Sequence, residues 1–266
     1  FVRLSTIKRI ITSFRWRFLS PNLPIISNPS SVNRFGSFYG GKFCVEPSSE
    51  KFLVISGGAG QDISFEMEIL KEYKGATLIL LDPSEYAIDY VSNVVSRFGK
   101  SRTADYLSSN YQSPHSYDLT EINESRFIFI PKALWNNNDG VALFPPKDDR
   151  DLSESINAIH HFYWQNVESR KVPSVTIRSV LESCLYENIE ILKLDIEGAA
   201  KETITQMFVD QIFPRQIILE FDEIHFPSWK SKIRAEHLHN LILNSGYQLV
   251  HTDRTDYTYA TNITNK

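Results

Sequence analysis

The stretch from Lys51 to Asp82 constrains the fold of this 266-residue chain more than any other segment. Phe52 to Ile55 is a short apolar, β-branched run of the kind found in buried parallel strands. The turn Ser56-Gly57-Gly58-Ala59-Gly60 follows directly, and its glycines can adopt positive φ. Apolar residues at helical spacing between Asp62, a candidate N-cap, and Gly75 predict a helix, and Thr77 to Leu81 predicts a strand ending at Asp82. The stretch therefore predicts a strand, glycine turn, helix, strand unit.

The glycine turn and Asp82 together indicate a nucleotide-like ligand. Asp82 lies 22 residues after Gly60, about where nucleotide-binding sheets place the carboxylate that accepts ribose hydroxyls. A tight turn can favour glycine without any ligand, but the carboxylate favours an adenosine-type cofactor. Ile63 stands where a dinucleotide fingerprint requires Gly or Ala, and no P-loop lysine follows. S-adenosylmethionine carries no phosphate, so the pattern favours a methyltransferase, with an NAD-dependent oxidoreductase as the alternative.

Charge and composition bound the remaining possibilities. Seven basic residues precede Glu46, the first acidic residue, so the net charge of −4 conceals an acidic main body. Such a body argues against nucleic-acid binding. Cys44 and Cys184 are too few for a disulfide framework or a zinc site, and we expect reduced core thiols in a cytoplasmic protein. No apolar run is long enough for a membrane span. The chain begins with Phe, so we expect an upstream portion.

Two regions are predicted along the chain. Residues 1–49 form a basic N-terminal helix and an irregular lead-in, and residues 50–266 form the main domain. The helix over residues 1–20 could make a peripheral contact with an anionic membrane, or it could pack on the main domain. Four prolines among Ser and Asn in residues 20–50 predict irregular structure.

Strands alternate with helices through the main domain, which predicts a mostly parallel sheet with helices on both faces. The predicted strands end at Asp82, Asp195 and Glu220, and ligands of such sheets bind at the carboxyl ends of strands. A closing hairpin is predicted near the C-terminus. Residues 145–171 are long and polar and carry Phe162, Tyr163 and Trp164, which predicts a segment covering the acceptor site.

The sequence resembles the FkbM family of S-adenosylmethionine-dependent methyltransferases. The resemblance rests on five blocks in order: ISGGAGQDISFEMEIL, LLDPSEYAIDYV, ALWNNNDGVALFPP, EILKLDIEGAAKE and IILEFDEIH. Two positions depart from the family pattern, namely Ser56, where Asp is common, and Ala200, where Glu or Asp is common. A non-catalytic module that keeps the fold is therefore a second alternative.

The resemblance implies a class I methyltransferase, an α/β Rossmann-like fold with a seven-stranded sheet and a C-terminal antiparallel hairpin. It implies methyl transfer to a hydroxyl of a small molecule or carbohydrate, either a sugar or a secondary metabolite. The expected cofactor-binding residues are Ser56, Gly57, Gly58, Gly60, Asp62, Asp82, Pro83, Ala133 and Asp195.

Asp195 is the first candidate for the base that removes the hydroxyl proton. Glu197 is the next candidate, and Lys193 could hold either carboxylate in place. Purely structural roles are the alternative: Glu197 capping the next helix and Lys193 in a salt bridge. His225 is a second base candidate because histidine titrates near neutral pH. Asp195, Glu220 and Asp222 could together bind Mg²⁺, but the same groups serve equally well as hydrogen-bond acceptors, and no metal is predicted.

Overall fold

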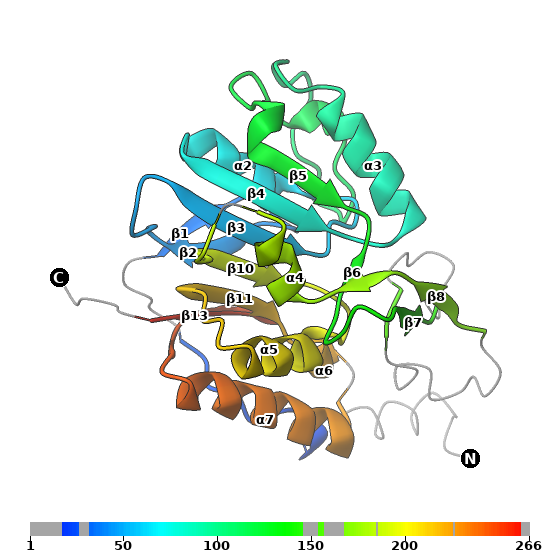
Figure 1. The fold of residues 1–266 in the computed structure, drawn as a ribbon, viewed down its shortest axis with the longest axis vertical. Coiled ribbons are helices and arrows are strands. Elements are labelled where there is room, and N and C mark those ends of the chain that lie inside the picture. Colours follow the sequence, from blue (N-terminus) through cyan, green and yellow to red (C-terminus); the bar gives the residue numbers. More distant parts are fainter. Residues whose placement is uncertain are drawn as a thin grey trace, which may run out of the picture.

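A computed structural model describes residues 18–26, 32–145, 154–156, 168–184, 186–225 and 227–261. A seven-stranded sheet organises this part of the chain (Figure 1), in the order β12-β13-β11-β10-β3-β4-β5. The strands in that order are Gln248–Asp253, Asp256–Ala260, Gln216–Glu220, Ile191–Leu194, Phe52–Gly57, Ala76–Leu81 and Phe127–Ile130. Strands β11, β10, β3, β4 and β5 run parallel, while β13 is antiparallel to β11 and β12. The predicted sheet and its closing hairpin are confirmed.

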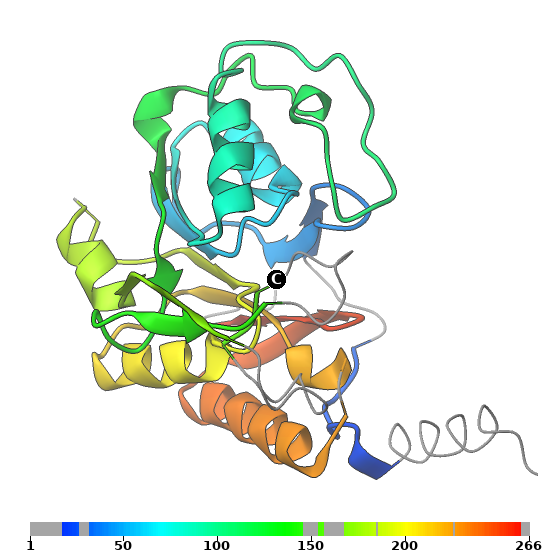
Figure 2. The same ribbon diagram turned by 90° about the vertical axis from the view of Figure 1, so that its right-hand side faces the viewer.

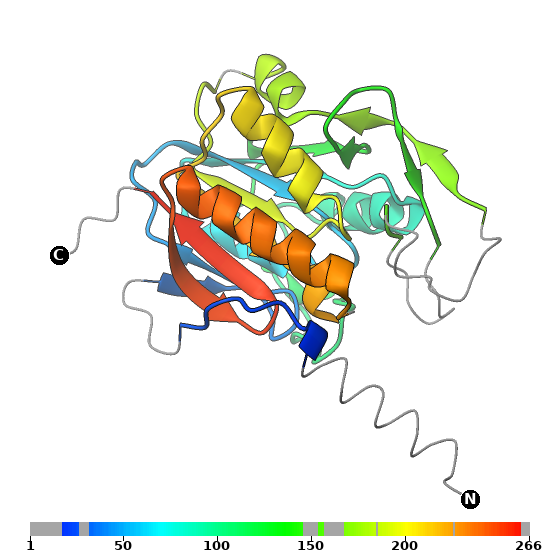
Figure 3. The same cartoon turned by 90° about the horizontal axis from the view of Figure 1, so that it is seen from below.

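Helices cover both faces because the central strands are apolar on both sides. Leu53 and Ile55 face the core shared with α4 (Ile177–Glu182), α5 (Ala200–Val209) and α7 (Trp229–Asn244), and α5 and α7 lie side by side in Figure 3. Phe52 and Val54 face the opposite core, shared with α2 (Ser64–Glu72) and α3 (Glu85–Val95). The strand order reverses between β3 and β10, so the carboxyl ends of these strands form the switch point where open α/β sheets bind ligands.

The lead-in is not wholly irregular, which corrects the sequence-based prediction. Strand β1 (Val32–Phe35) pairs antiparallel with β2 (Lys42–Val45). The side chain of Gln216 exchanges two hydrogen bonds with the backbone of Val45, and Thr258 Oγ1 donates to the carbonyl of Phe43. The β1–β2 hairpin, residues 32–45, therefore packs on the main sheet and lies beside α2 (Figure 2). Proline and serine content pointed to irregular structure because it reports local preference and not these long-range contacts.

Shorter elements complete the described chain. Strands β6 (Ala133–Leu134) and β9 (Ser174–Val175) pair parallel, and β7 (Val141–Leu143) pairs antiparallel with β8 (Arg170–Val172). Two 3₁₀ turns, η1 (Pro114–Ser116) and η2 (Glu124–Arg126), precede β5, and the short helix α6 (Asp222–His225) follows β11. Most of the segment predicted to cover the acceptor site, including Phe162, Tyr163 and Trp164, lies outside the described residues. The same holds for residues 1–17 of the predicted N-terminal helix.

Both cysteines are free, as predicted, but only one of them is a core thiol. Cys44 is buried in β2, whereas Cys184 is only partly buried. None of the helices in the described part of the chain is long and apolar enough to span a membrane.

Candidate active site

The glycine loop lies between β3 and α2, at the carboxyl edge of the sheet. Gly58 has φ +88°, and a Cβ at this position would lie 1.8 Å from the backbone oxygen of Asp195, so only glycine fits. Gly60 has φ +50°, but a Cβ there would meet nothing within 4 Å. The loop is therefore packed against β10 at Gly58 and open to a ligand at Gly60.

Lys193 supports the glycine loop and forms the salt bridge that was the structural alternative to its holding Asp195 or Glu197. Its side chain is buried, and Nζ donates to the carbonyl of Gly58 at 2.8 Å and lies 3.1 Å from Glu66 of α2. The Glu66 carboxylate also accepts a hydrogen bond from Ser56 Oγ at 2.6 Å. A buried charge needs such a partner, so Lys193 and Glu66 position the loop. A catalytic role for Lys193 stays a prediction.

Asp82 also holds the glycine loop. Its Oδ2 accepts hydrogen bonds from the backbone N–H of Ala59 at 2.9 Å and of Gly60 at 3.1 Å. Its Oδ1 accepts from the N–H and hydroxyl of Ser84. Pro83 follows at the tip of β4. The Asp82 carboxylate therefore orders the glycine loop itself, and its predicted contact with ribose would come in addition to these four hydrogen bonds.

Asp62 does not cap α2 as predicted, because the helix begins at Ser64 with Ile63 as its N-cap residue. One Asp62 oxygen accepts from the N–H of Ser64. The other accepts from Ser37 Oγ at 2.5 Å and from the N–H of Gly40 at 3.1 Å. Asp62 therefore joins the glycine loop to the turn of the β1–β2 hairpin.

Ala133, the remaining predicted cofactor residue, is buried in β6. Its neighbour Leu134 packs against the glycine loop, since a Cβ on Gly57 would lie 2.9 Å from Leu134 Cδ1. The Ala133 side chain packs instead with Val141, Leu143 and Val172, so its contact with the cofactor stays a prediction.

A cluster of charged side chains surrounds Asp195 at the end of β10. Lys42 Nζ lies 3.3 Å from Asp195 Oδ2, 3.6 Å from Glu220 Oε2 and 2.7 Å from Asp256 Oδ1. The Lys42 ammonium therefore bridges the Asp195 and Glu220 carboxyl groups. The Asp195 N–H donates to the carbonyl of Gly57 at 3.0 Å. The charged cluster therefore adjoins the glycine loop.

The two carboxyl groups that Lys42 bridges have pKa values shifted in opposite directions. Burial and the neighbouring Glu220 carboxylate raise the pKa of Asp195 to about 8. Burial also acts on Glu220, but hydrogen bonding from His225 and the Lys42 charge outweigh it and lower the pKa of Glu220. Asp195 is therefore the more basic of the two carboxyl groups.

Glu197 and His225 lie close to this cluster. Glu197 has φ 46°, which is uncommon for a residue with a side chain, and it precedes Gly198, whose N–H donates to Asp222 Oδ2 at 2.5 Å. Glu197 does not cap α5, because the N-cap residue is Ala199 and no side chain caps it. His225 Nε2 lies 3.2 Å from Glu220 Oε1, and this hydrogen bond raises the pKa of His225. The direct partner of the His225 ring is therefore the Glu220 carboxylate.

The arrangement also bears on the metal alternative. Asp222 is engaged with the N–H of Gly198, and the Lys42 ammonium occupies the position between the Asp195 and Glu220 carboxylates. Within the described residues, no group of three or more histidine, cysteine, aspartate or glutamate side chains is arranged to hold a metal ion.

Sequence reasoning missed the hairpin residues at this site, above all Lys42. Tyr39, in the hairpin turn, is half exposed, and burial together with Glu220, Asp195 and Glu197 raises its pKa. Phe38, beside it, is largely exposed. The available signal was the isolated Lys42 at the start of an apolar run, but no local pattern reveals partners more than 150 residues away.

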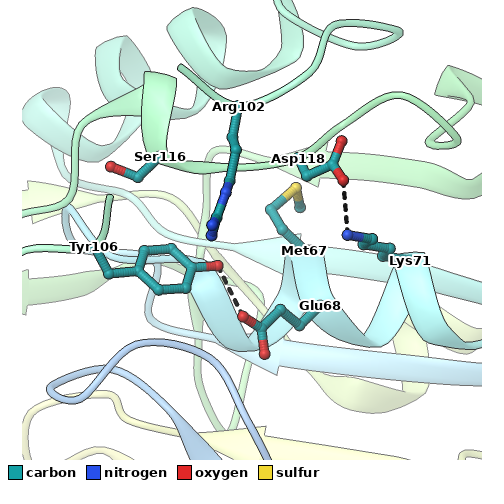
Figure 4. Close-up of a pocket in the computed structure, with 7 residues that line it drawn as sticks. All are labelled: Met67, Glu68, Lys71, Arg102, Tyr106, Ser116 and Asp118. Atoms are coloured by element: carbon teal, nitrogen blue, oxygen red, sulfur yellow. Dashed lines mark hydrogen bonds and ion pairs between the residues drawn. The ribbon is translucent and has the colours of Figure 1, made fainter. Parts of the chain in front are cut away.

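A separate shallow pocket lies along the outer side of α2 (Figure 4), where Tyr106 Oη donates to Glu68 at 2.9 Å and Lys71 pairs with Asp118 at 2.7 Å. None of its lining residues belongs to the predicted site. The Glu68 carboxylate is hydrogen-bonded to Tyr106 and the Lys71 ammonium is paired with Asp118, so these charged groups already have partners within the pocket. It therefore offers no alternative to the carboxyl edge.

The sheet order and the glycine loop at the switch point are those of the class I methyltransferase fold. The sequence profile described as "Methyltransferase FkbM domain" matches residues 81–249, more than half of the chain. The chain therefore belongs to the FkbM methyltransferase family.

Two further comparisons add little to this assignment. No curated protein matches the sequence. Among solved structures, the chain is similar to one from a fibrillarin/Nop5p complex, with 9% identity and a TM-score of 0.40 over 81% of this chain and 74% of that one.

The residues of the glycine loop fit S-adenosylmethionine, the methyl donor that the family implies. The open backbone at Gly60 admits close approach, and the carboxylates of Asp82, Asp195 and Glu197 suit a ligand that carries ribose hydroxyls and positive charge. Ile63, where a dinucleotide fingerprint requires a small residue, is fully buried and is the N-cap residue of α2. The loop therefore favours S-adenosylmethionine over NAD.

Proposed function

We propose that the protein methylates a hydroxyl oxygen, on a sugar or on a secondary metabolite, and that Asp195 receives the hydroxyl proton. The observation that carries this proposal is the Asp195–Glu220–Lys42 cluster, placed beside the glycine loop at the carboxyl edge. S-adenosylmethionine, when bound, supplies an electrophilic methyl group on a sulfonium centre. The chain must then orient the acceptor and take up its proton.

The two carboxyl groups divide this task. Glu220, the more acidic of the two, is held by Lys42 and His225. Asp195 becomes a base once it loses its own proton, so its basic form increases as the pH rises through about 8. A carboxylate with a raised pKa is a stronger base than an exposed one, which suits the removal of a proton from a weakly acidic hydroxyl.

The hairpin turn supports a ring-shaped, hydroxylated acceptor. Tyr39 presents a half-exposed aromatic ring close to Glu220, Asp195 and Glu197, whose carboxylates can accept hydrogen bonds. Aromatic faces pack on the apolar faces of sugar rings, while carboxylates bind the hydroxyls at the ring edge. This combination favours a sugar or polyhydroxylated metabolite over an apolar acceptor.

Two assays test the proposal. Isothermal titration with S-adenosylmethionine and with NAD should show binding of the first only. Incubation with isotope-labelled donor and a panel of methyl glycosides and hydroxylated metabolites should then give a product that gains one labelled methyl on oxygen. Binding of NAD in place of S-adenosylmethionine would contradict the assignment. Binding without transfer to any acceptor would favour the non-catalytic alternative.

A further inference from the structure

Lys42 is the first residue of β2, and it lies outside the segment that the family profile matches. Its side chain is 5% exposed, and its ammonium contacts carboxylates at the ends of β10 and β11 and at the start of β13. In the described part of the chain, it is the one cation within 4 Å of Asp195. A buried lysine needs such compensation, and the three carboxylates raise its pKa well above the usual value despite burial.

The backbone of the hairpin fixes this position. Hydrogen bonds from Thr258 to Phe43 and between Val45 and Gln216 hold β2 against β13 and β11. At the other end of the turn, Asp62 of the glycine loop binds Ser37 and Gly40. The hairpin thus connects the cofactor loop with the cluster around Asp195, and Lys42 is the side chain that completes the connection.

We propose that Lys42 is a positioning residue of the methyl-transfer site, whose ammonium holds the Asp195 and Glu220 carboxyl groups together. This inference rests on the proposed function of Asp195. It makes the β1–β2 hairpin part of the active site and not a lead-in to it.

The charges around Asp195 and Glu220 decide whether removal of Lys42 raises or lowers the pKa of Asp195. Lys42 lowers the pKa of Asp195, whereas burial and Glu220 raise it. Further charged or titratable groups face the cluster from every neighbouring element: Asp256 on β13, Lys193 on β10 with Glu66 on α2, Glu197 after β10, Asp222 and His225 on α6, and Tyr39 in the hairpin turn. Most of these are acidic, so removal of Lys42 leaves Asp195 in a more negative environment and strengthens its hold on the proton.

Carboxyl-carbon NMR titration of Asp195 in the presence of S-adenosylhomocysteine tests this directly and needs no acceptor. Lys42→Met keeps the aliphatic stem, and we expect the pKa of Asp195 to rise by about 1–3 units, the usual effect of an opposite charge at this distance. Lys42→Arg should restore the wild-type titration. Lys71→Met, which removes an exposed lysine paired with Asp118, is the matched control and should leave it unchanged.

If Lys42→Met does not fold, Asp256→Asn gives an independent test. It keeps Lys42 but removes a competing carboxylate, so the pKa of Asp195 should fall. An Asp195 titration that is the same in wild type and in either folded variant overturns the proposal. With an acceptor in hand, Lys42→Met should lower kcat and move the pH–rate profile upward with the NMR titration. A lower Tm with an unchanged profile would assign Lys42 a structural role only. Failure to bind S-adenosylmethionine would instead refute the proposed function.

Discussion

Replacement of Asp82 by Ala removes the acceptor of four hydrogen bonds that order the cofactor loop and the start of α3. The amides of Ala59 and Gly60 and the polar groups of Ser84 lose a charged partner. Each buried donor left without a partner costs about 1–3 kcal/mol, and water entering the vacated space recovers part of this. We expect a net loss of roughly 2–4 kcal/mol in unfolding free energy, at about 2–4 °C of Tm per kcal/mol for a domain of this size.

Cofactor affinity should fall as well, because the loop loses its order and the ribose loses an acceptor. Each 1.4 kcal/mol corresponds to about a tenfold change in Kd, so we expect S-adenosylmethionine to bind at least ~10-fold more weakly. Asp105→Ala is the control, since the Asp105 side chain is almost fully exposed and its ion pair is with Arg102. Isothermal titration measures affinity, and thermal unfolding on the same samples measures stability.

A deoxyribose analogue separates the two roles of Asp82. If Asp82 binds ribose, wild-type protein should prefer S-adenosylhomocysteine over its 2′,3′-dideoxy analogue, and the Ala variant should lose most of that preference. If Asp82 acts only on the loop, both ligands should weaken equally. A folded Asp82→Ala protein with wild-type affinity and wild-type Tm would refute the reasoning.

Two further predictions concern the loop and the pH dependence. Gly58→Ala should destabilise the protein by roughly 3 kcal/mol or more, because a left-handed φ costs about 1–2 kcal/mol and the added Cβ overlaps the backbone of Asp195. Gly60→Ala should cost only the energy of the left-handed φ and should act mainly on cofactor affinity. Equal melting temperatures for the two variants would contradict this. The methylation rate should rise with pH through about 8, because Asp195 acts as a base only after it loses its proton; a rate that falls over this range would show that the protonated form is the active one.

The parallel sheet could be predicted because its central strands are buried on both faces and therefore appear as continuous apolar runs between glycine turns and helices. Asp195 could be placed at the carboxyl edge for the same reason. Burial also hinted at Lys193, since a lysine inside an apolar strand needs a partner, but its sequence does not show which partner it finds. In the parallel register Lys193 lies opposite Ser56, on the side of α2, and so meets Glu66.

The hairpin could not be predicted from local patterns. Its strands have four residues each, and their stability comes from contacts with Gln216 and Thr258, far along the chain. The same distance hid Lys42 from the predicted site. Asp62 shows the same limit at shorter range. Its residue type and position predicted a helix N-cap, but one of its oxygens accepts from the N–H of Ser64 and the other binds the hairpin turn.

The most direct test of the account is a comparison of methyl transfer by wild type, Asp195→Asn and Asp105→Asn, with labelled S-adenosylmethionine and the acceptor found in the glycoside and metabolite panel. Asp195→Asn keeps the size of the side chain and removes the base, so turnover should fall about 10²–10⁴-fold while cofactor affinity and Tm stay close to wild type. Asp105→Asn should match wild type. An Asp195→Asn protein that melts normally and methylates at the wild-type rate would contradict the account.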